Sequence, residues 1–103
     1  MKLLVITAVS TFEKPIRESL KKARVGAFSY TQVTGYKDLK DQPMGENWFS
    51  SGVGEHKSVL FYAFVPNELV DLVIQNIDSM NEMEESHSKI HVAVLDILKH
   101  NKE

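Results

Sequence analysis

The chain contains no cysteine, only three prolines and a single tryptophan among its 103 residues. The absence of cysteine excludes disulfides, thiol nucleophiles and cysteine-based zinc sites. It also fits a protein of the reducing cytoplasm, where disulfides are rare. The tryptophan lies in residues 34–57, the longest stretch without a clear helical or strand periodicity.

A strong charge of either sign is also missing, since 12 basic residues stand against 14 acidic ones and the net charge is −2. Non-specific binding of nucleic acid requires a basic face, so this function is not expected. The start, "MKLLVITAVSTFEKP", is apolar over too few residues to span a membrane and has no signal-peptide cleavage pattern. We therefore expect a cytoplasmic protein that neither binds nucleic acid nor inserts into a membrane.

The composition that remains is that of one soluble globular domain, which we place at residues 1–103. Apolar residues make up 43 % of the chain and charged residues 25 %, which is ordinary for such a domain. A chain of this length can bury a hydrophobic core.

The first half of the chain predicts a strand, a helix and a second strand. Residues 2–9, "KLLVITAV", form a continuous β-rich run. Ser10 and Glu13 have the spacing of a capping box, and Gly26 is a natural residue to end the helix that follows. Between them one apolar helical stripe is formed by Phe12, Ile16, Leu20 and Ala23. Residues 27–36 then alternate as a strand does.

The second half predicts a strand over 57–65, a helix from residue 67 to about residue 84, and a strand over 89–98. The order β-α-β-β-α-β is that of the ferredoxin-like α+β fold, a four-stranded antiparallel sheet with two helices on one face. The first, third and fourth predicted strands are apolar on both sides, so the sheet face without helices needs another cover. We expect self-association through this face.

With this order in place, the chain resembles the P-II (nitrogen regulatory protein) signalling family, as a divergent P-II-like member. The stretches that carry the resemblance are "MKLLVITAV", "GAFSYTQVTGYKD", "FVPNELVDLVIQNI" and "SKIHVAVLDILKHNK". The resemblance implies a signal-transduction protein, not an enzyme, that forms a homotrimer. It implies clefts between subunits that bind adenine nucleotides such as ATP or ADP. It also implies that residues 37–55 correspond to the mobile T-loop, which docks on a transporter, an enzyme or a regulator.

The resemblance maps part of the nucleotide site onto Thr31, Gly35 and Tyr36, at and before the start of the T-loop-like segment. A second part falls on the loop before the last strand, where the family has glycines and a lysine. Here that loop reads "EESHSK": Lys89 matches the lysine, but the glycines that let backbone N–H groups approach a phosphate are absent. The acidic residues of this loop also repel phosphate.

The third part of the site is a pair of basic residues near the C-terminus, which falls on His100 and Lys102. Neither side chain offers the bidentate fork of an arginine. The phosphate-binding groups are therefore reduced, which leaves three alternatives open: an adenine nucleotide, another anionic small ligand in the same cleft, or no ligand. The tyrosine that the family modifies in its T-loop is missing as well.

Trp48 and Phe49 lie within the T-loop-like segment and have no evident catalytic partner. Large aromatic side chains of this kind often anchor a protein interface, so they are the predicted docking residues. By resemblance alone, the partner they would contact is a membrane transporter.

A second hypothesis is a metal-responsive P-II-like protein linked to heavy-metal efflux. Met80, Met83 and His87 follow one another at about one helical turn, and His56 comes from the base of the loop. Thioether and imidazole ligands suit Cu(I), and imidazole with carboxylate suits zinc, nickel or Cu(II). Methionines at helical spacing are also common core residues, so both interpretations of this cluster stand.

A third hypothesis is a small ferredoxin-like oligomeric enzyme, in which His91 on a strand face would line a cavity. Against it, the sequence contains no Ser/His/Asp grouping, nucleophile elbow or P-loop.

Overall fold

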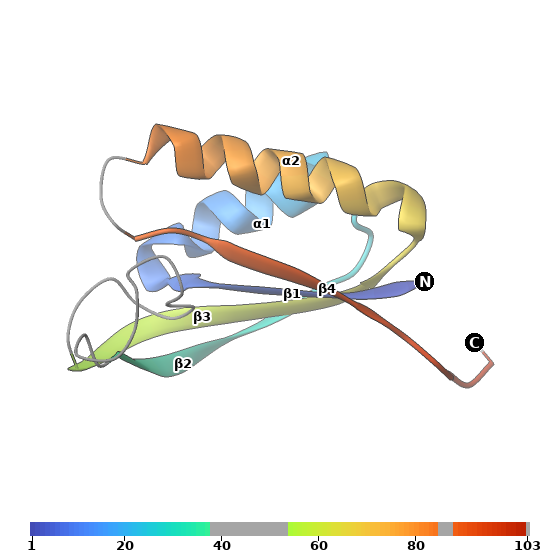
Figure 1. Ribbon diagram of the computed structural model, residues 1–103, viewed down its shortest axis with the longest axis horizontal. Coiled ribbons are helices and arrows are strands. Elements are labelled where there is room, and N and C mark those ends of the chain that lie inside the picture. The colour runs from blue at the N-terminus through green and yellow to red at the C-terminus, as the bar shows by residue number, and fades with distance from the viewer. Residues whose placement is uncertain (38–53, 85–87, 103) are drawn as a thin grey trace.

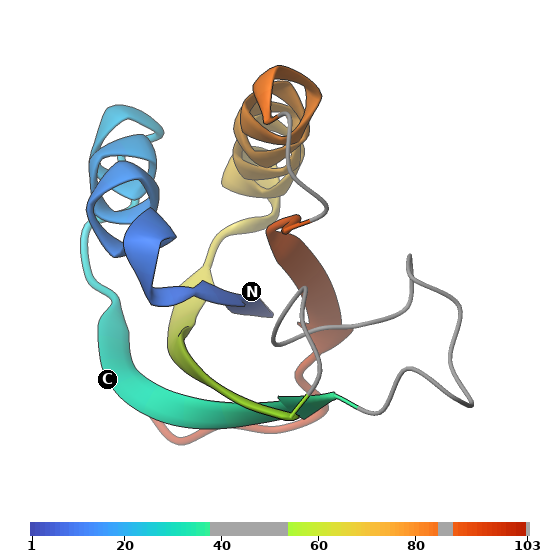
Figure 2. The ribbon, with the colours of Figure 1, turned by 90° about the vertical axis from the view of Figure 1, so that its left-hand side faces the viewer.

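The computed structural model describes residues 1–37, 54–84 and 88–102. Its elements follow the predicted order: β1 (Lys2–Val9), η1 (Ser10–Phe12), α1 (Glu13–Lys22), β2 (Ser29–Lys37), β3 (Gly54–Val65), α2 (Asn67–Met83) and β4 (His91–Asp96). The four strands form one sheet in the order β2-β3-β1-β4, and every neighbouring pair is antiparallel. Both helices lie on the same face of this sheet (Figures 1 and 2). The ferredoxin-like α+β fold is confirmed.

The ends of several strands differ from the prediction. β4 is shorter at both ends than the predicted 89–98, and β2 begins two residues later than predicted. β3 begins earlier, at Gly54, so Lys37 and residues 54–55 of the predicted loop 37–55 belong to strands. Strand ends are decided by the neighbouring strand, which the periodicity of a single segment does not reveal.

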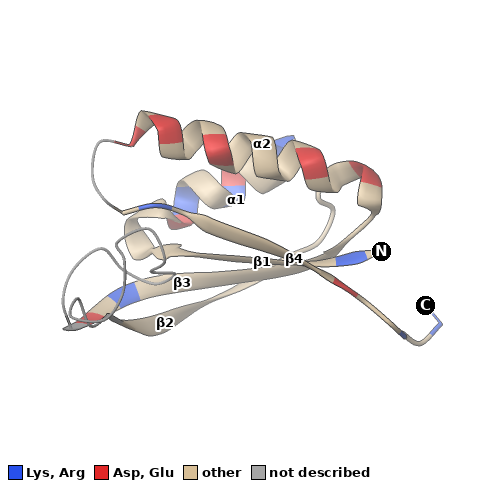
Figure 3. Ribbon diagram, in the orientation of Figure 1, with Lys and Arg blue, Asp and Glu red and all other residues tan. Residues whose placement is uncertain are grey.

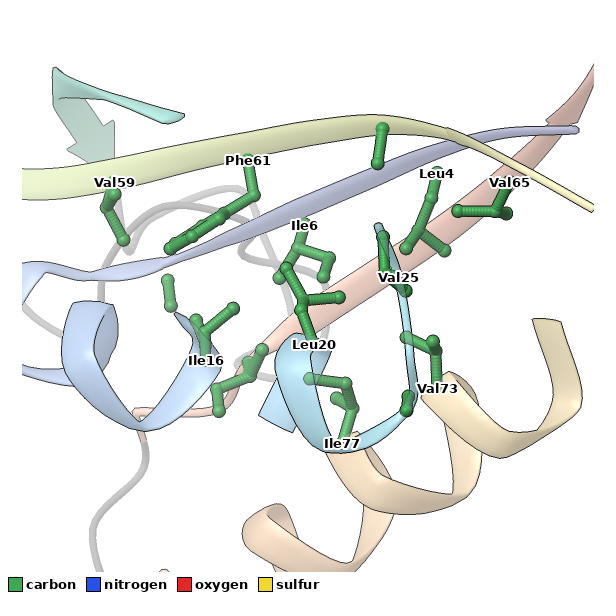
Figure 4. Close-up of a cluster of buried hydrophobic side chains, with 14 residues drawn as sticks. Leu4, Ile6, Ile16, Leu20, Val25, Val59, Phe61, Val65, Val73 and Ile77 are labelled. Carbon is green, nitrogen blue, oxygen red and sulfur yellow. The ribbon is translucent and has the colours of Figure 1, made fainter. Parts of the chain in front are cut away.

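The core lies between the sheet and the two helices (Figure 4). Alternate strand residues point toward the helices, because side chains of a strand alternate between its two faces. From the sheet the core receives Leu4, Ile6, Ala8, Val59, Phe61, Ala63 and Val65, and from the helices Ile16, Leu20, Val73 and Ile77, all nearly inaccessible to solvent. The predicted helical stripe of α1 is thus the stripe that is buried, with Phe12 at its edge.

The predicted capping box at the start of α1 is wrong. No side chain caps this helix. Ser10 Oγ instead donates a hydrogen bond to Gln32 Oε1 (3.2 Å), and Gln32 Nε2 donates to Glu13 Oε1 (3.1 Å). Both residues of the presumed box therefore fasten β2 to the beginning of α1.

The end of α1 also differs from the prediction, because Arg24 rather than Gly26 takes the left-handed conformation, with φ of 63°. The Arg24 N–H bonds to the Lys21 carbonyl and the Val25 N–H to the Leu20 carbonyl, both at 3.0 Å. This is the pattern of a Schellman motif, in which glycine is usual at the left-handed position.

The opposite face of the sheet is also rich in apolar side chains, and neither described helix covers it (Figure 2). The register places Leu3, Phe64 and Leu95 side by side on this face, and Val5 beside Tyr62. Phe64 is 58 % exposed, Leu95 46 % and Tyr62 45 %. We call the face that carries these side chains the open face.

Candidate functional site

Gly35 and Tyr36 lie near the end of β2, opposite His56 and Glu55 of β3. Gly35 is buried on the open face, whereas Tyr36 points to the other side of the strand and is 65 % exposed. The structure therefore places them where a loop between β2 and β3 departs, which is the position expected from the sequence.

Thr31 lies four residues earlier on β2, on the same face as Gly35 and opposite Leu60. It is exposed, and its Oγ1 donates a hydrogen bond to the Gln32 carbonyl (3.3 Å). Its hydroxyl oxygen keeps acceptor capacity for a ligand on the open face.

Lys89 has a role that the sequence did not reveal. Its Nζ donates hydrogen bonds to the carbonyls of Asn81 (2.9 Å) and Glu84 (3.2 Å), at the C-terminal end of α2. A cation is stabilised there by the helix dipole, and α2 carries acidic residues along its length (Figure 3). The ammonium group is exposed and has one further N–H available to an anion.

Asn81 fixes the start of the last strand. Its side-chain amide exchanges two hydrogen bonds of 2.8 Å with the backbone N–H and carbonyl of Ile90. Because its own backbone carbonyl also accepts the bond from Lys89, Asn81 ties both Lys89 and Ile90 to α2. The lysine is therefore held in place rather than free to move with a surface loop.

Gly35 and Lys89 lie at the same end of the sheet but on opposite edges. Gly35 belongs to the edge strand β2, and Lys89 immediately precedes the other edge strand, β4. Three inter-strand spacings separate the two edges, roughly 14 Å. One protomer alone therefore does not bring these parts of the predicted site together.

His100 and Lys102 lie at the other end of the sheet, in the tail that leaves the body after β4 (Figure 1). β4 ends at Asp96, which pairs with Lys2 at the beginning of β1. Both tail residues are exposed, and His100 Nδ1 lies 2.8 Å from the Asn101 carbonyl oxygen. Within one protomer they are thus remote from both Gly35 and Lys89.

A slot of about 290 Å³ lies at the outer edge of β3. It was not predicted from the sequence. β2 begins with the pair Ser29–Tyr62, so it leaves the edge of β3 uncovered from Ala63 onward. The slot is lined by Ala27, Phe28, Ser29, Tyr62, Ala63 and Phe64. Phe28, which forms one wall of the slot, packs against the core: the centre of its ring lies 6.0 Å from the centre of the Phe61 ring. A β2 that began at residue 27, as predicted, would have extended along this edge.

The three predicted metal ligands that the structure describes do not lie together. Met80 packs against the core, Met83 is 84 % exposed, and His56 lies on the open face, across the sheet from α2. His87 is outside the described residues. No group of three or more histidine, aspartate or glutamate side chains among the described residues has the arrangement of a metal site.

His91 lies on the open face opposite Thr7 and is half-buried. Farther along β4, the exposed Asp96 forms an ion pair with Lys2. The hydrogen bond and positive charge of Lys2 lower the pKa of the Asp96 carboxyl. This pair joins the ends of two strands, as a structural contact does. The predicted docking residues Trp48 and Phe49 are outside the described residues.

Solved structures of several other proteins share this architecture. One is CPII, a nitrogen regulatory PII-like protein from Thiomonas intermedia K12 bound to ADP, AMP and bicarbonate, with 16 % identity, a TM-score of 0.63, and coverage of 97 % of this chain and 94 % of that one. A second, a DUF3240 family protein from Shewanella baltica, has 14 % identity, a TM-score of 0.69, and coverage of 99 % and 94 %. A third, a putative PII-like signalling protein from Thermus thermophilus, has 19 % identity, a TM-score of 0.62, and coverage of 90 % and 82 %.

The chain has the fold of the PII-like proteins. The resemblance inferred from the sequence is thus confirmed at the level of the fold. No family model matches the chain, and no curated protein matches it in sequence. Within the described residues, no helix is long and apolar enough to cross a membrane.

Proposed function

We propose that this protein is a PII-like signal transducer that binds a small effector, an adenine nucleotide, between the subunits of a homotrimer. The observation that carries the proposal is the division of the site. Gly35 and Tyr36 lie on one edge of the sheet, Lys89 lies on the other, and the tail with His100 and Lys102 leaves from the far end. A site divided in this way is completed only by a neighbouring subunit.

The open face supplies the reason to associate. Its exposed aromatic and aliphatic side chains gain stability when they leave water, by about 25 cal/mol per Å² of apolar surface. The groups to be joined lie on opposite edges, so the contact between neighbours is head-to-tail. A head-to-tail contact that closes produces a ring, and a trimer is such a ring.

The slot at the edge of β3 lies at the beginning of β2, at the other end of the sheet from Gly35, so it would take a flat heterocycle at a place apart from the cleft of Gly35 and Lys89. Phe28, Tyr62 and Phe64 provide aromatic surface on which a flat heterocycle can stack. Strand backbone and the Ser29 hydroxyl offer hydrogen-bond partners to the edge of such a ring. ADP and AMP are bound in one of the proteins that share the fold.

The phosphate end of the effector would meet Lys89, whose third N–H has no partner among the described residues, and the cationic tail of a neighbour. Because Lys89 already neutralises the C-terminal end of α2, only part of its charge is available. We therefore expect weak binding of polyphosphates and a preference for nucleotides of low charge, such as AMP or ADP, over ATP.

The output would be carried by residues 38–53, with Trp48 and Phe49 as the contacts to a partner protein, a membrane transporter, in the cytoplasm. The effector must bind two states of this loop with different affinities, since otherwise it transmits no signal. Trp48→Ala would then abolish capture of the partner and leave the trimer intact.

The proposal is tested by calorimetric titration of the purified protein with AMP, ADP and ATP. Lys89→Ala is expected to weaken binding by roughly 1.5–3 kcal/mol, the range of a charged hydrogen bond. Two controls separate charge from structure: Lys14→Ala removes an exposed lysine of α1, and Asn81→Ala loosens the loop but keeps the ammonium group. Absence of nucleotide binding, or equal losses in Lys89→Ala and Lys14→Ala, would refute the proposed site.

A further inference from the structure

A second hollow lies on the helix layer, between α1 and α2, away from the open face. Its volume is about 320 Å³. That is at the lower end of the range for small-molecule sites, so its occupant would be smaller than a nucleotide. Pro15 and Met80 form its apolar walls, and its polar lining consists of Glu18, Ser19, Lys22, Asn76 and Ser79. The two helices that carry these residues lie side by side over the sheet (Figure 2).

These five polar side chains do not contribute polar contacts to the described part of the fold. None of them forms a hydrogen bond or an ion pair with another described residue. Surface side chains are often satisfied by water alone, but here five of them converge on one hollow. Together they offer one carboxylate, one ammonium group, two hydroxyls and one amide.

Ser19 distinguishes this groove from an ordinary surface depression. The residue is only 9 % exposed, and its hydroxyl is buried without a hydrogen-bond partner among the described residues. Leaving a hydroxyl buried and unsatisfied is unfavourable, and such groups are rare in folded proteins. A ligand in the groove would supply the missing partner.

Glu18 and Lys22 give the groove opposite charges one helical turn apart. This i, i+4 order favours an ion pair on a helix, yet the two side chains are not paired with each other. An unpaired carboxylate and an unpaired ammonium group one helical turn apart suit a molecule that carries both charges on groups bonded to one carbon.

We propose that the groove between α1 and α2 binds a small zwitterion of the amino-acid class. Lys22 would receive the carboxylate of the ligand and Glu18 its ammonium group. Ser19, Asn76 and Ser79 would complete the hydrogen bonds of these groups. Met80 and Pro15 would contact the ligand's side chain. The site is distinct from the proposed nucleotide cleft, because none of Gly35, Tyr36 and Lys89 lines it.

The test is a calorimetric titration of the wild-type protein with each of the common free amino acids. N-acetylated amino acids, which keep only the negative charge, and amino-acid methyl esters, which keep only the positive charge, are titrated alongside. At least one free amino acid is expected to bind, and its two singly charged analogues to bind about tenfold more weakly or worse.

Four variants, one of them a control, assign the binding to the groove. Lys22→Gln and Glu18→Gln should each weaken it at least about tenfold, and Lys21→Gln, an exposed neighbour that does not line the groove, should leave it unchanged. Ser19→Ala has a double signature: it removes a ligand contact but also an unsatisfied buried hydroxyl. It should therefore raise the melting temperature of the free protein while lowering affinity.

Three results would overturn the proposal. The first is that no free amino acid binds. The second is that the singly charged analogues bind as well as the zwitterion, which would mean that Glu18 and Lys22 do not recognise the two charges of the ligand. The third is that Lys22→Gln and Ser19→Ala bind as tightly as the wild type, which would place the ligand elsewhere. A normal response to nucleotides in the same preparations would leave the cleft proposal untouched by any of these results.

Discussion

The two faces of the sheet are built from the same strands and are both apolar, but only one of them is covered by helices. Phe61 and Phe64 lie three residues apart on β3, yet Phe61 is 1 % exposed and Phe64 is 58 % exposed. Helix-facing side chains hold the subunit together, whereas the large side chains Phe64, Leu95 and Tyr62 of the open face are 58 %, 46 % and 45 % exposed. A face with such side chains is typical of a surface that binds another protein.

This contrast assigns different tasks to the two faces. The covered face provides the free energy of folding. The open face, in our account, provides the free energy of association, which in turn brings Gly35 and Lys89 of different subunits together. Substitutions on one face should therefore change the melting of the subunit, and substitutions on the other should change the mass of the assembly.

The largest effect is expected for Phe61→Ala, which removes a ring that is buried against Phe28 and Tyr30. The loss should be about 3–5 kcal/mol of unfolding free energy, the usual result for a deeply buried phenylalanine. Chemical denaturation measures it. Phe64→Ala is the matched control, and an equal loss of subunit stability in the two variants at a concentration where the subunit is monomeric would contradict the contrast.

The next largest effect is expected for Phe64→Lys on the open face. A charge placed in an apolar contact between subunits should weaken each contact by roughly 2–5 kcal/mol, because it is desolvated without a partner. Size-exclusion chromatography with light scattering should show a smaller species with unchanged helical circular dichroism. Leu72→Lys on the exposed side of α2 is the control and should leave the assembly intact.

A smaller effect is expected for Asn81→Ala, which removes the two hydrogen bonds to Ile90. These bonds fix where β4 begins, and a shift of one residue would exchange the two faces of that strand. The loss should be about 1–3 kcal/mol, with faster amide exchange in β4 than in β1. Uniform protection of both strands, as in the wild type, would show that Asn81 does not hold this register.

The smallest effect is expected from pH, through the exposed pair of Lys2 and Asp96. The hydrogen bond from Lys2 lowers the pKa of Asp96 in the folded state. The contribution of the pair is therefore present above the ordinary pKa of an aspartate and is lost as the pH falls through the lowered value. The wild type should be slightly more stable than Lys2→Gln near neutral pH and equal to it in strong acid. If the wild type remained more stable than Lys2→Gln in strong acid, the ion pair with Asp96 would not be the cause of the difference in stability.

Much of the fold followed from the sequence because its evidence is local. Apolar residues spaced by three and four predicted the buried stripe of α1, and β-rich runs or alternation predicted the four strands. The prediction of a capping box was wrong because Ser10 and Glu13 both form hydrogen bonds with Gln32 of β2. This is a tertiary contact, which the spacing of Ser10 and Glu13 in the sequence does not reveal.

The candidate site was predictable only in part, because some of its features depend on tertiary contacts rather than on local sequence. Gly35 and Tyr36 lie at the base of the loop as expected, because the end of a strand can be read from the sequence. The attachment of Lys89 to α2 and the slot beside Phe64 depend on where β4 and β2 begin. Pairing between strands decides those positions.

The most direct test of the central claim is the mass of the wild-type protein in solution, measured by sedimentation equilibrium over a range of concentrations. The account predicts a stable species of three times the mass of the chain, and its conversion to a smaller species by Phe64→Lys but not by Leu72→Lys. A wild-type protein that remains monomeric at all concentrations would contradict the account, since one subunit alone does not bring Gly35 and Lys89 together.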